Sequence, residues 1–375
     1  MIPRILEKTL SDVLLPDAPR KVVCIFGARQ TGKTTLMRKL FDKLDGRKEF
    51  YNGDFDNDRV LFAPTRETLQ QVAAHLDYLF IDEAQNIPDI GRVLKLLHDS
   101  FPRLRIVASG SAAFDLRRRT GEPLTGRQIV LEMFPLSLAE LVPTPLALPA
   151  HIEHGLIYGA YPEVAQTADP AQKQNLLRQL AADYLLKDIF AHVDASPDRL
   201  RDLLRLLAFQ IGSEVSLNEL AAAARMDFKT VDRYIGLLEG AHVIFRLGAF
   251  SRNLRKEIFK SRKIYFTDLG IRNALLNAFA PLQLRDDTGH LWENYLVIER
   301  RKFLMNCGQN FAAWFWRTYD RQEIDYIEER DGALSAFEFK RGAKARGKLP
   351  PVFAEAYPGV KFAVVNRENC AEFLL

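Results

Sequence analysis

Residues 21–40, KVVCIFGARQTGKTTLMRKL, constrain the fold of this chain more than any other stretch. An apolar run at residues 21–26 leads into a glycine-containing loop that ends in lysine and threonine, and a helical pattern follows. This is the P-loop spacing, GxxxxGK[ST], in its required strand–loop–helix setting. Backbone N–H groups of such a loop surround phosphate oxygens at a helix N-terminus. A simple turn before a helix explains neither the lysine nor the spacing, so the sequence predicts a nucleotide site.

The loop also supplies side chains that suit ATP and Mg²⁺. Lys33 is placed to reach the outer phosphates, and the Thr34 hydroxyl is placed to bind Mg²⁺. We expect the nucleotide to be held by the whole loop, which comprises Gly27, Ala28, Arg29, Gln30, Thr31, Gly32, Lys33, Thr34 and Thr35.

A second apolar run, LDYLFIDEAQNI at residues 76–87, carries two adjacent acids. A parallel strand delivers such residues to the sheet edge beside the P-loop, so Asp82 fits a Walker B magnesium ligand. Glu83 can orient the water that attacks the γ-phosphate, which favours hydrolysis over transfer to a small acceptor. A helix N-cap with a first-turn acid is the alternative for this pair.

A third apolar run, LRIVASGSA at residues 104–112, places Ser109 and Ser111 at a strand exit. Either hydroxyl could contact the γ-phosphate. Serines that simply end a strand are the alternative.

The middle of the chain predicts a helix-turn-helix. Residues 215–247 read as a helix, a turn, a second helix that begins near Asp227, and a strand. Ser216 and Asp227 are the expected N-caps. The following stretch, SRNLRKEIFKSRKIYF, predicts a basic hairpin with Arg252, Arg255, Lys256, Lys260, Arg262 and Lys263.

This winged helix-turn-helix has two candidate partners. One is DNA, with Lys229, Thr230 and Arg233 of the second helix and Arg252, Arg255 and Lys256 of the wing on the phosphates. The other is a protein surface, and a basic run is also commonly a solvated face. We rank DNA first.

Near the end of the chain, EIDYIEERDGALSAFEFK at residues 323–340 predicts a hairpin around Asp331–Gly332. Such a turn places Asp325 opposite Glu338, and Glu323 opposite Lys340. Opposed carboxylates repel, because their Cβ atoms lie roughly 4.5–5.5 Å apart. A divalent cation bound by Asp325 and Glu338 would compensate. A hairpin with charge pairs alone is the alternative. We expect the other face to be buried, with Ile324, Tyr326, Phe337 and Phe339.

Several motifs together resemble one bacterial and archaeal family of AAA-type ATPases, within the AAA+ superfamily, whose C-terminal domain has no known function. They are GARQTGKTT, LFIDEAQNI, GSAAFDL, LTGRQIVLEMFPLSLAEL and GAYPEV, and the resemblance covers most of the chain. It implies a homo-oligomer in which an arginine of a neighbouring subunit completes the site. Arg127 is the candidate, with Arg117, Arg118 and Arg119 as alternatives; a solvated surface charge is the other reading of each.

The C-terminal order of helix, three strands, helix and strand resembles the PD-(D/E)xK restriction-endonuclease-like fold. The resemblance implies that Asp325 and Glu338 bind Mg²⁺, that Lys340 positions or activates water, and that Glu293 on the preceding helix assists. Many relatives keep this fold without the activity.

The sequence and these resemblances thus predict an α/β protein with four parts: a P-loop, AAA+-like parallel-sheet core at 1–150, a segment at 151–205 whose helical pattern resembles the lid of AAA+ proteins, a winged helix-turn-helix at 206–275 and a restriction-endonuclease-like α/β domain at 285–375. We expect ATP hydrolysis coupled to nucleic-acid binding, with Mg²⁺-dependent phosphodiester cleavage as a further hypothesis. The alternative is a nucleotide-dependent switch or scaffold whose inactive nuclease-like domain binds a protein.

The chain has neither a membrane-spanning apolar stretch nor a signal peptide, which predicts a cytoplasmic protein without membrane contact. Its three cysteines, Cys24, Cys307 and Cys370, lack metal-site or disulfide spacing, and we expect them in the core.

Overall fold

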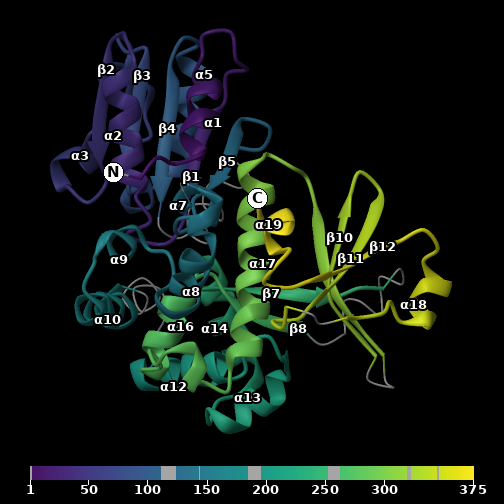
Figure 1. The fold of residues 1–375 in the computed structure, drawn as a ribbon. Helices are drawn as coiled ribbons and strands as arrows, with labels where there is room; N and C mark the ends of the chain where they lie inside the picture. Colours follow the sequence, from purple (N-terminus) through teal and green to yellow (C-terminus); the bar gives the residue numbers. More distant parts are fainter. Residues whose placement is uncertain are drawn as a thin grey trace. The chain divides into compact units, whose positions relative to one another are not determined.

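Five parallel strands form the sheet of the N-terminal part in this computed structural model, which describes residues 2–110, 124–142, 144–184, 196–251, 262–318, 322–343 and 346–375 (Figure 1). The strand order is β2-β3-β4-β1-β5. The strands are β1 (Val22–Phe26), β2 (Lys48–Asn52), β3 (Tyr78–Asp82), β4 (Arg105–Gly110) and β5 (Gln128–Glu132). This confirms the predicted parallel core and brings the carboxyl ends of β1, β3 and β4 to one edge.

Helices cover both faces of this sheet because its strands are apolar on both sides. Val23 and Ile25 of β1 pack with α1 and α2, whereas Val22, Cys24 and Phe26 pack with α4 and α5. Burying each such side chain contributes about 1.5–3 kcal/mol. The helical elements here are α1 (Leu6–Val13), α2 (Lys33–Lys43), α3 (Asp56–Val60), α4 (Arg66–Ala73), the 3₁₀ turn Ala84–Asn86 and α5 (Ile90–Ser100).

The chain divides into two units, and the five-stranded sheet belongs to the first. This unit contains residues 2–135 with Gly240–His242, and the second contains Leu136–Glu239 and Val243–Leu375. The second unit begins with helical segments. They are α7 (Leu138–Leu141), the 3₁₀ turn Pro145–Ala147, α8 (Leu148–Tyr158), α9 (Pro162–Gln166), α10 (Pro170–Gln179), the π-helical turn Leu180–Tyr184 and α12 (Pro197–Phe209).

The predicted helix-turn-helix elements follow as α13 (Leu217–Ala223) and α14 (Phe228–Gly240). Ser216 Oγ accepts the amide N–H of Glu219 at 3.4 Å, and Asp227 Oδ1 accepts that of Thr230 at 2.9 Å. Both predicted N-caps are therefore confirmed. Three antiparallel strands accompany these helices: β6 (Glu214–Val215), β7 (Ile244–Ala249) and β8 (Arg262–Phe266).

One mixed sheet of seven strands, β12-β11-β10-β9-β7-β8-β6, runs through the rest of the second unit. The parallel pairing of β7 with β9 joins the wing strands to the C-terminal strands, which the sequence had not indicated. The remaining elements are α16 (Leu269–Leu276), the 3₁₀ turn Leu282–Leu284, α17 (Thr288–Asn306), β9 (Ala312–Arg317), β10 (Glu323–Arg330), β11 (Ala333–Phe339), α18 (Pro351–Ala356), β12 (Lys361–Val365) and α19 (Cys370–Leu374). From α17 to β12 their order is the predicted one.

The β10–β11 hairpin has the predicted register, with Tyr326 opposite Phe337 and Arg330 opposite Ala333. Against β9, the register of β10 shifts between Ile324 and Ile327, so that both of these residues are buried in the same core. The strand therefore departs from strict alternation.

Two expectations from composition can be compared with the structure. Among the described helices, none is both long and apolar enough to cross a bilayer. Cys24 and Cys370 are buried as predicted, but Cys307 is exposed. Cys307 follows the last turn of α17, and Leu304 is the last residue of that helix that is buried.

Candidate functional site

The P-loop runs from the end of β1 to the start of α2, as predicted. Gly32 has a φ of 97°, a value that favours glycine. A Cβ atom at Gly27 would overlap the carbonyl oxygen of Met133, just after β5. Both glycines of the motif are therefore required by the backbone.

Lys33, the first residue of α2, is buried with 4% of its surface exposed. Its Nζ donates hydrogen bonds to the carbonyl oxygens of Gly27 at 2.8 Å and Ala28 at 2.9 Å. Thr31 Oγ1 donates to the same Ala28 oxygen at 2.9 Å. The Lys33 ammonium is thus held within the P-loop, where it can contact the phosphates of a bound nucleotide.

Thr34, Asp82 and Ser109 meet at the carboxyl edge of the sheet. Thr34 Oγ1 donates to Asp82 Oδ2 at 2.6 Å, and the Ser109 hydroxyl donates to Asp82 Oδ1. A hydroxyl beside a carboxylate is the type of oxygen pair that Mg²⁺ prefers, so these residues fit a Mg²⁺–ATP complex. The predicted contact of Ser109 with the γ-phosphate stays a prediction. Ser111 and Arg117–Arg119 lie outside the described residues.

Glu83 lies directly after β3 in the left-handed region, with a φ of 47°. Such strain in a residue other than glycine costs about 1–3 kcal/mol and is concentrated at functional sites. Gln85 Nε2 donates to Glu83 Oε2 at 2.5 Å, and the Glu83 amide donates to Ser109 Oγ at 3.3 Å. Burial raises the pKa of the Glu83 carboxyl, although Lys33 opposes this. The side chain is therefore held beside Asp82 as a stronger proton acceptor than a solvated glutamate.

Arg4 was missed by the sequence analysis. Its Nη1 donates to the carbonyl oxygen of Thr31 at 3.0 Å, and its Nη2 donates to that of Phe134 at 2.6 Å. One guanidinium thus connects the P-loop to the segment after β5. No motif precedes the P-loop, so nothing in the sequence distinguishes this arginine.

Arg127, the predicted trans-acting arginine, lies just before β5. Its carbonyl accepts the amide N–H of Val22 at 2.8 Å, at the start of β1, and its Nε donates to Asp99 at 2.9 Å. The P-loop follows the other end of β1, so Arg127 is not part of the site of its own subunit. Its role in a neighbouring subunit stays a prediction.

A second candidate site is an acidic cluster where α17, β8 and β10 meet. Lys263 Nζ lies 2.9 Å from Glu293 Oε1 and 2.6 Å from Glu323 Oε1. The Tyr265 hydroxyl also donates to Glu293 Oε1, at 2.7 Å. Lys263, one of the six basic residues of the predicted hairpin, is only 3% exposed, so its ammonium is available neither to a partner surface nor to solvent. The β7–β9 pairing carries β8 into the interior.

Asp325 lies beside this cluster, and its Oδ2 accepts the amide N–H of Phe339 at 2.7 Å. The charge-pair alternative implied an ion pair between Glu323 and Lys340. Instead, Glu323 binds Lys263, and Lys340 Nζ lies 2.8 Å from Glu338 Oε1. In the described parts of the chain, no group of three or more Asp, Glu, His or Cys side chains could hold a metal ion. Metal binding by Asp325 and Glu338 stays a prediction.

Burial, with a further contribution from Glu293, raises the pKa of Asp325 to about 7. The folded pKa thus exceeds the ordinary aspartate value of 3.8, and the folded state binds the proton more tightly. The free energy of unfolding therefore falls as the pH rises from about 4 to 7, because Asp325 ionises at a lower pH in the unfolded chain than in the folded one. We expect Asp325→Asn to remove this pH dependence and to stabilise the second unit at pH 8 by on the order of 2 kcal/mol.

Tryptophan fluorescence measures this effect, because Trp292, Trp314 and Trp316, the three tryptophans, all lie in the second unit. The matched control is Glu329→Gln on the same strand, which should keep the wild-type profile. Equal unfolding midpoints for wild type and Asp325→Asn at pH 5 and pH 8 would contradict a raised pKa of Asp325.

The predicted DNA-contacting residues are described only in part. Lys229 and Arg233 are exposed on α14, and the guanidinium of Arg233 lies 5.4 Å from the ring centre of Tyr234. Arg252, Arg255 and Lys256 lie outside the described residues. DNA binding stays a prediction.

Among known proteins, the first unit is similar to a described domain family, whereas the second unit is similar only to domains of unknown function. Residues 19–142 match the model of an AAA domain family. In the second unit, residues 150–282 and 288–373 each match a model described as a domain of unknown function, DUF8612 and DUF4143 respectively. The AAA-like core therefore contains the P-loop, Asp82, Glu83 and Ser109. None of the three descriptions mentions a nuclease.

Similar whole chains are themselves uncharacterized. One from Mycobacterium tuberculosis is 29% identical over 327 residues, covering 85% of this chain and 70% of its own length. One from Methanocaldococcus jannaschii is 22% identical over 362 residues, covering 89% and 79%. Among solved structures, a Thermotoga maritima RuvB mutant is 18% identical, covering 66% of this chain and 90% of its own, with a TM-score of 0.35. That score is too low to support a conclusion.

Proposed function

We propose that this chain is a Mg²⁺-dependent ATPase whose AAA-like core hydrolyses ATP. The observation that carries the proposal is the hydrogen bond from Thr34, at the end of the P-loop, to Asp82. Glu83 directly follows Asp82 in the chain. A P-loop beside a Walker B carboxylate is the arrangement that binds Mg²⁺ and triphosphate together. The strained Glu83 adds the group that hydrolysis needs.

Each residue has a separate role in this proposal. Lys33 neutralises the outer phosphates, and Thr34 and Asp82 hold Mg²⁺, which neutralises phosphate charge when bound. Glu83 orients the attacking water and accepts its proton. Ser109 positions Asp82 and the Glu83 amide through its two hydrogen bonds. In a homo-oligomer, Arg127 of a neighbouring subunit is the candidate to stabilise the developing charge.

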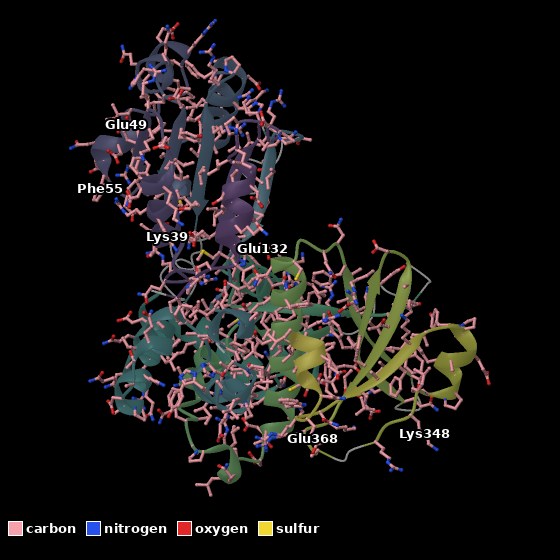
Figure 2. The ribbon with its side chains drawn as sticks, turned by 45° about the horizontal axis from the view of Figure 1, so that its top comes forward. Lys39, Glu49, Phe55, Glu132, Lys348 and Glu368 are labelled. Carbon is pink, nitrogen blue, oxygen red and sulfur yellow. The ribbon has the colours of Figure 1, made fainter. Side chains whose placement is uncertain are left out.

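Replacing Lys33 with alanine tests the nucleotide site. We expect affinity for Mg²⁺–ATP to fall by a factor of about 10–100, because a charge-assisted contact contributes about 1.5–3 kcal/mol. Binding calorimetry measures this directly. The control is Lys39→Ala on the same helix, a partly exposed lysine that pairs with Glu7 at 2.8 Å (Figure 2). Equal affinity in the wild type and both variants would refute the site.

For the second unit, we infer a nucleotide-dependent switch rather than phosphodiester cleavage, because no group of three or more Asp, Glu, His or Cys side chains among the described residues could hold a metal ion. The Lys263 ammonium already compensates Glu293 and Glu323, so these acids do not require a metal ion. Plasmid incubated with ATP and Mg²⁺ or Mn²⁺ distinguishes the two functions. Cleavage by the wild type that Asp325→Ala abolishes would establish the nuclease and overturn the switch.

A further inference from the structure

Two sequence motifs have no role in the ATP chemistry described above: FPLS at residues 134–137 and GAYPEV at residues 159–164. The first lies in a segment that we call the connector, residues 133–138. This segment follows β5, which ends at Glu132 (Figure 2), and it contains the boundary between the two units.

The first half of the connector forms a wall of the P-loop. The Met133 amide donates to the carbonyl oxygen of Phe26 at 2.6 Å, and the Met133 carbonyl lies against the Cα atom of Gly27. Arg4 bonds the Phe134 carbonyl and the Thr31 carbonyl at the same time. A change in the P-loop backbone must therefore displace Met133, Phe134 or Arg4.

The second half of the connector is fixed within the second unit. The Leu136 amide donates to the carbonyl oxygen of Ala160, in the GAYPEV motif, at 2.9 Å. Lys302 Nζ donates to the Leu136 carbonyl at 3.1 Å, and Glu299 Oε2 accepts the Leu138 amide at 2.7 Å. The two motifs thus bond to each other through their backbones, and side chains of α17 hold the first of them.

Charge and stiffness both suit this segment to transmit movement. Glu299 and Lys302 are buried and lie 2.6 Å apart, an arrangement whose net contribution to stability is small but whose disruption is strongly destabilising. Pro135 fixes its own φ and restricts Phe134 to extended conformations. The connector is therefore short, stiff and hydrogen-bonded on both sides of Pro135.

We infer that the connector couples nucleotide binding at the P-loop to α17, with Arg4 as the positioning residue on the nucleotide side and Glu299 and Lys302 as the anchor. This inference rests on the proposed ATP site. Through this coupling, nucleotide binding at the P-loop would change the second unit, as the proposed switch requires.

Hydrogen exchange on the full chain tests the coupling. We expect Mg²⁺ with a non-hydrolysable ATP analogue to slow amide exchange at residues 27–34, and also at 136–141 and 296–304, by about fivefold or more. Arg4→Ala keeps the slowing at 27–34 under saturating analogue but loses it at 136–141 and 296–304. The control is Arg20→Ala, since Arg20 also donates to backbone carbonyls of the first unit, those of His98 and Phe101, away from the loop.

The outcomes separate this inference from the proposed function. Protection of 27–34 without change at 136–141 in the wild type overturns the coupling and leaves the ATP site intact. No protection at 27–34 overturns both. Full protection of 136–141 in Arg4→Ala removes the role of Arg4. If Arg4→Ala does not fold, the wild-type measurement alone decides.

Discussion

Replacing Glu83 with glutamine lowers ATP turnover by about 10²- to 10⁴-fold and leaves nucleotide affinity unchanged, because the variant cannot accept the proton of the attacking water. Glutamine has the same size and can still accept a hydrogen bond from Gln85, so the strained backbone is kept. Steady-state phosphate release and binding calorimetry give the two quantities. The affinity distinguishes this variant from Lys33→Ala, which loses binding.

The control for this prediction is Glu49→Gln on β2, an exposed glutamate of the same unit (Figure 2). It should hydrolyse ATP at the wild-type rate. Wild-type turnover in Glu83→Gln would show that another group orients the water and accepts its proton, and Glu83 would then have no catalytic role.

Replacing Lys263 with methionine should lower the free energy of unfolding of the second unit. The variant leaves Glu293 and Glu323 without the cation that lies between them. Breaking a fully buried ion pair costs about 3–5 kcal/mol, and we expect a loss at the lower end of this range, because Lys263 is 3% exposed but Glu293 and Glu323 are 16% and 33% exposed. We expect the denaturation midpoint of the second unit, followed by tryptophan fluorescence, to fall accordingly. The AAA-like core contains no tryptophan, so its unfolding does not interfere.

Lys340→Met provides the comparison. Lys340 is 46% exposed in its side chain and pairs with Glu338, an arrangement for which about 0–1 kcal/mol is expected. A loss for Lys263→Met that is as small as the loss for Lys340→Met would mean that the acidic cluster does not depend on the ammonium.

The sequence was sufficient where the determinants are local. The P-loop follows from its motif spacing, and the starts of α13 and α14 follow from the N-cap residues Ser216 and Asp227. The hairpin register follows from the Asp331–Gly332 turn, whose positive φ angles of 48° and 78° are those that a two-residue connection requires. Each of these features depends on neighbours within a few residues.

The sequence was insufficient where distant strands and chain ends meet. Lys263 is buried because β7 pairs with β9, and no pattern within the wing reports that pairing. Glu323 forms its ion pair with Lys263 of β8 rather than with Lys340 of the same hairpin, because β8 brings the Lys263 ammonium to 2.6 Å from Glu323 Oε1. Arg4 contacts Phe134 far along the chain, so only the folded structure relates them.

Phosphate release from ATP by the purified chain, with and without Mg²⁺, tests the ATPase most directly. We predict steady Mg²⁺-dependent release that Glu83→Gln reduces at least about 100-fold and Glu49→Gln does not change. Release that is absent from the wild type under every Mg²⁺ and ATP concentration, or that is equal in all three proteins, would contradict a hydrolytic site built on Glu83.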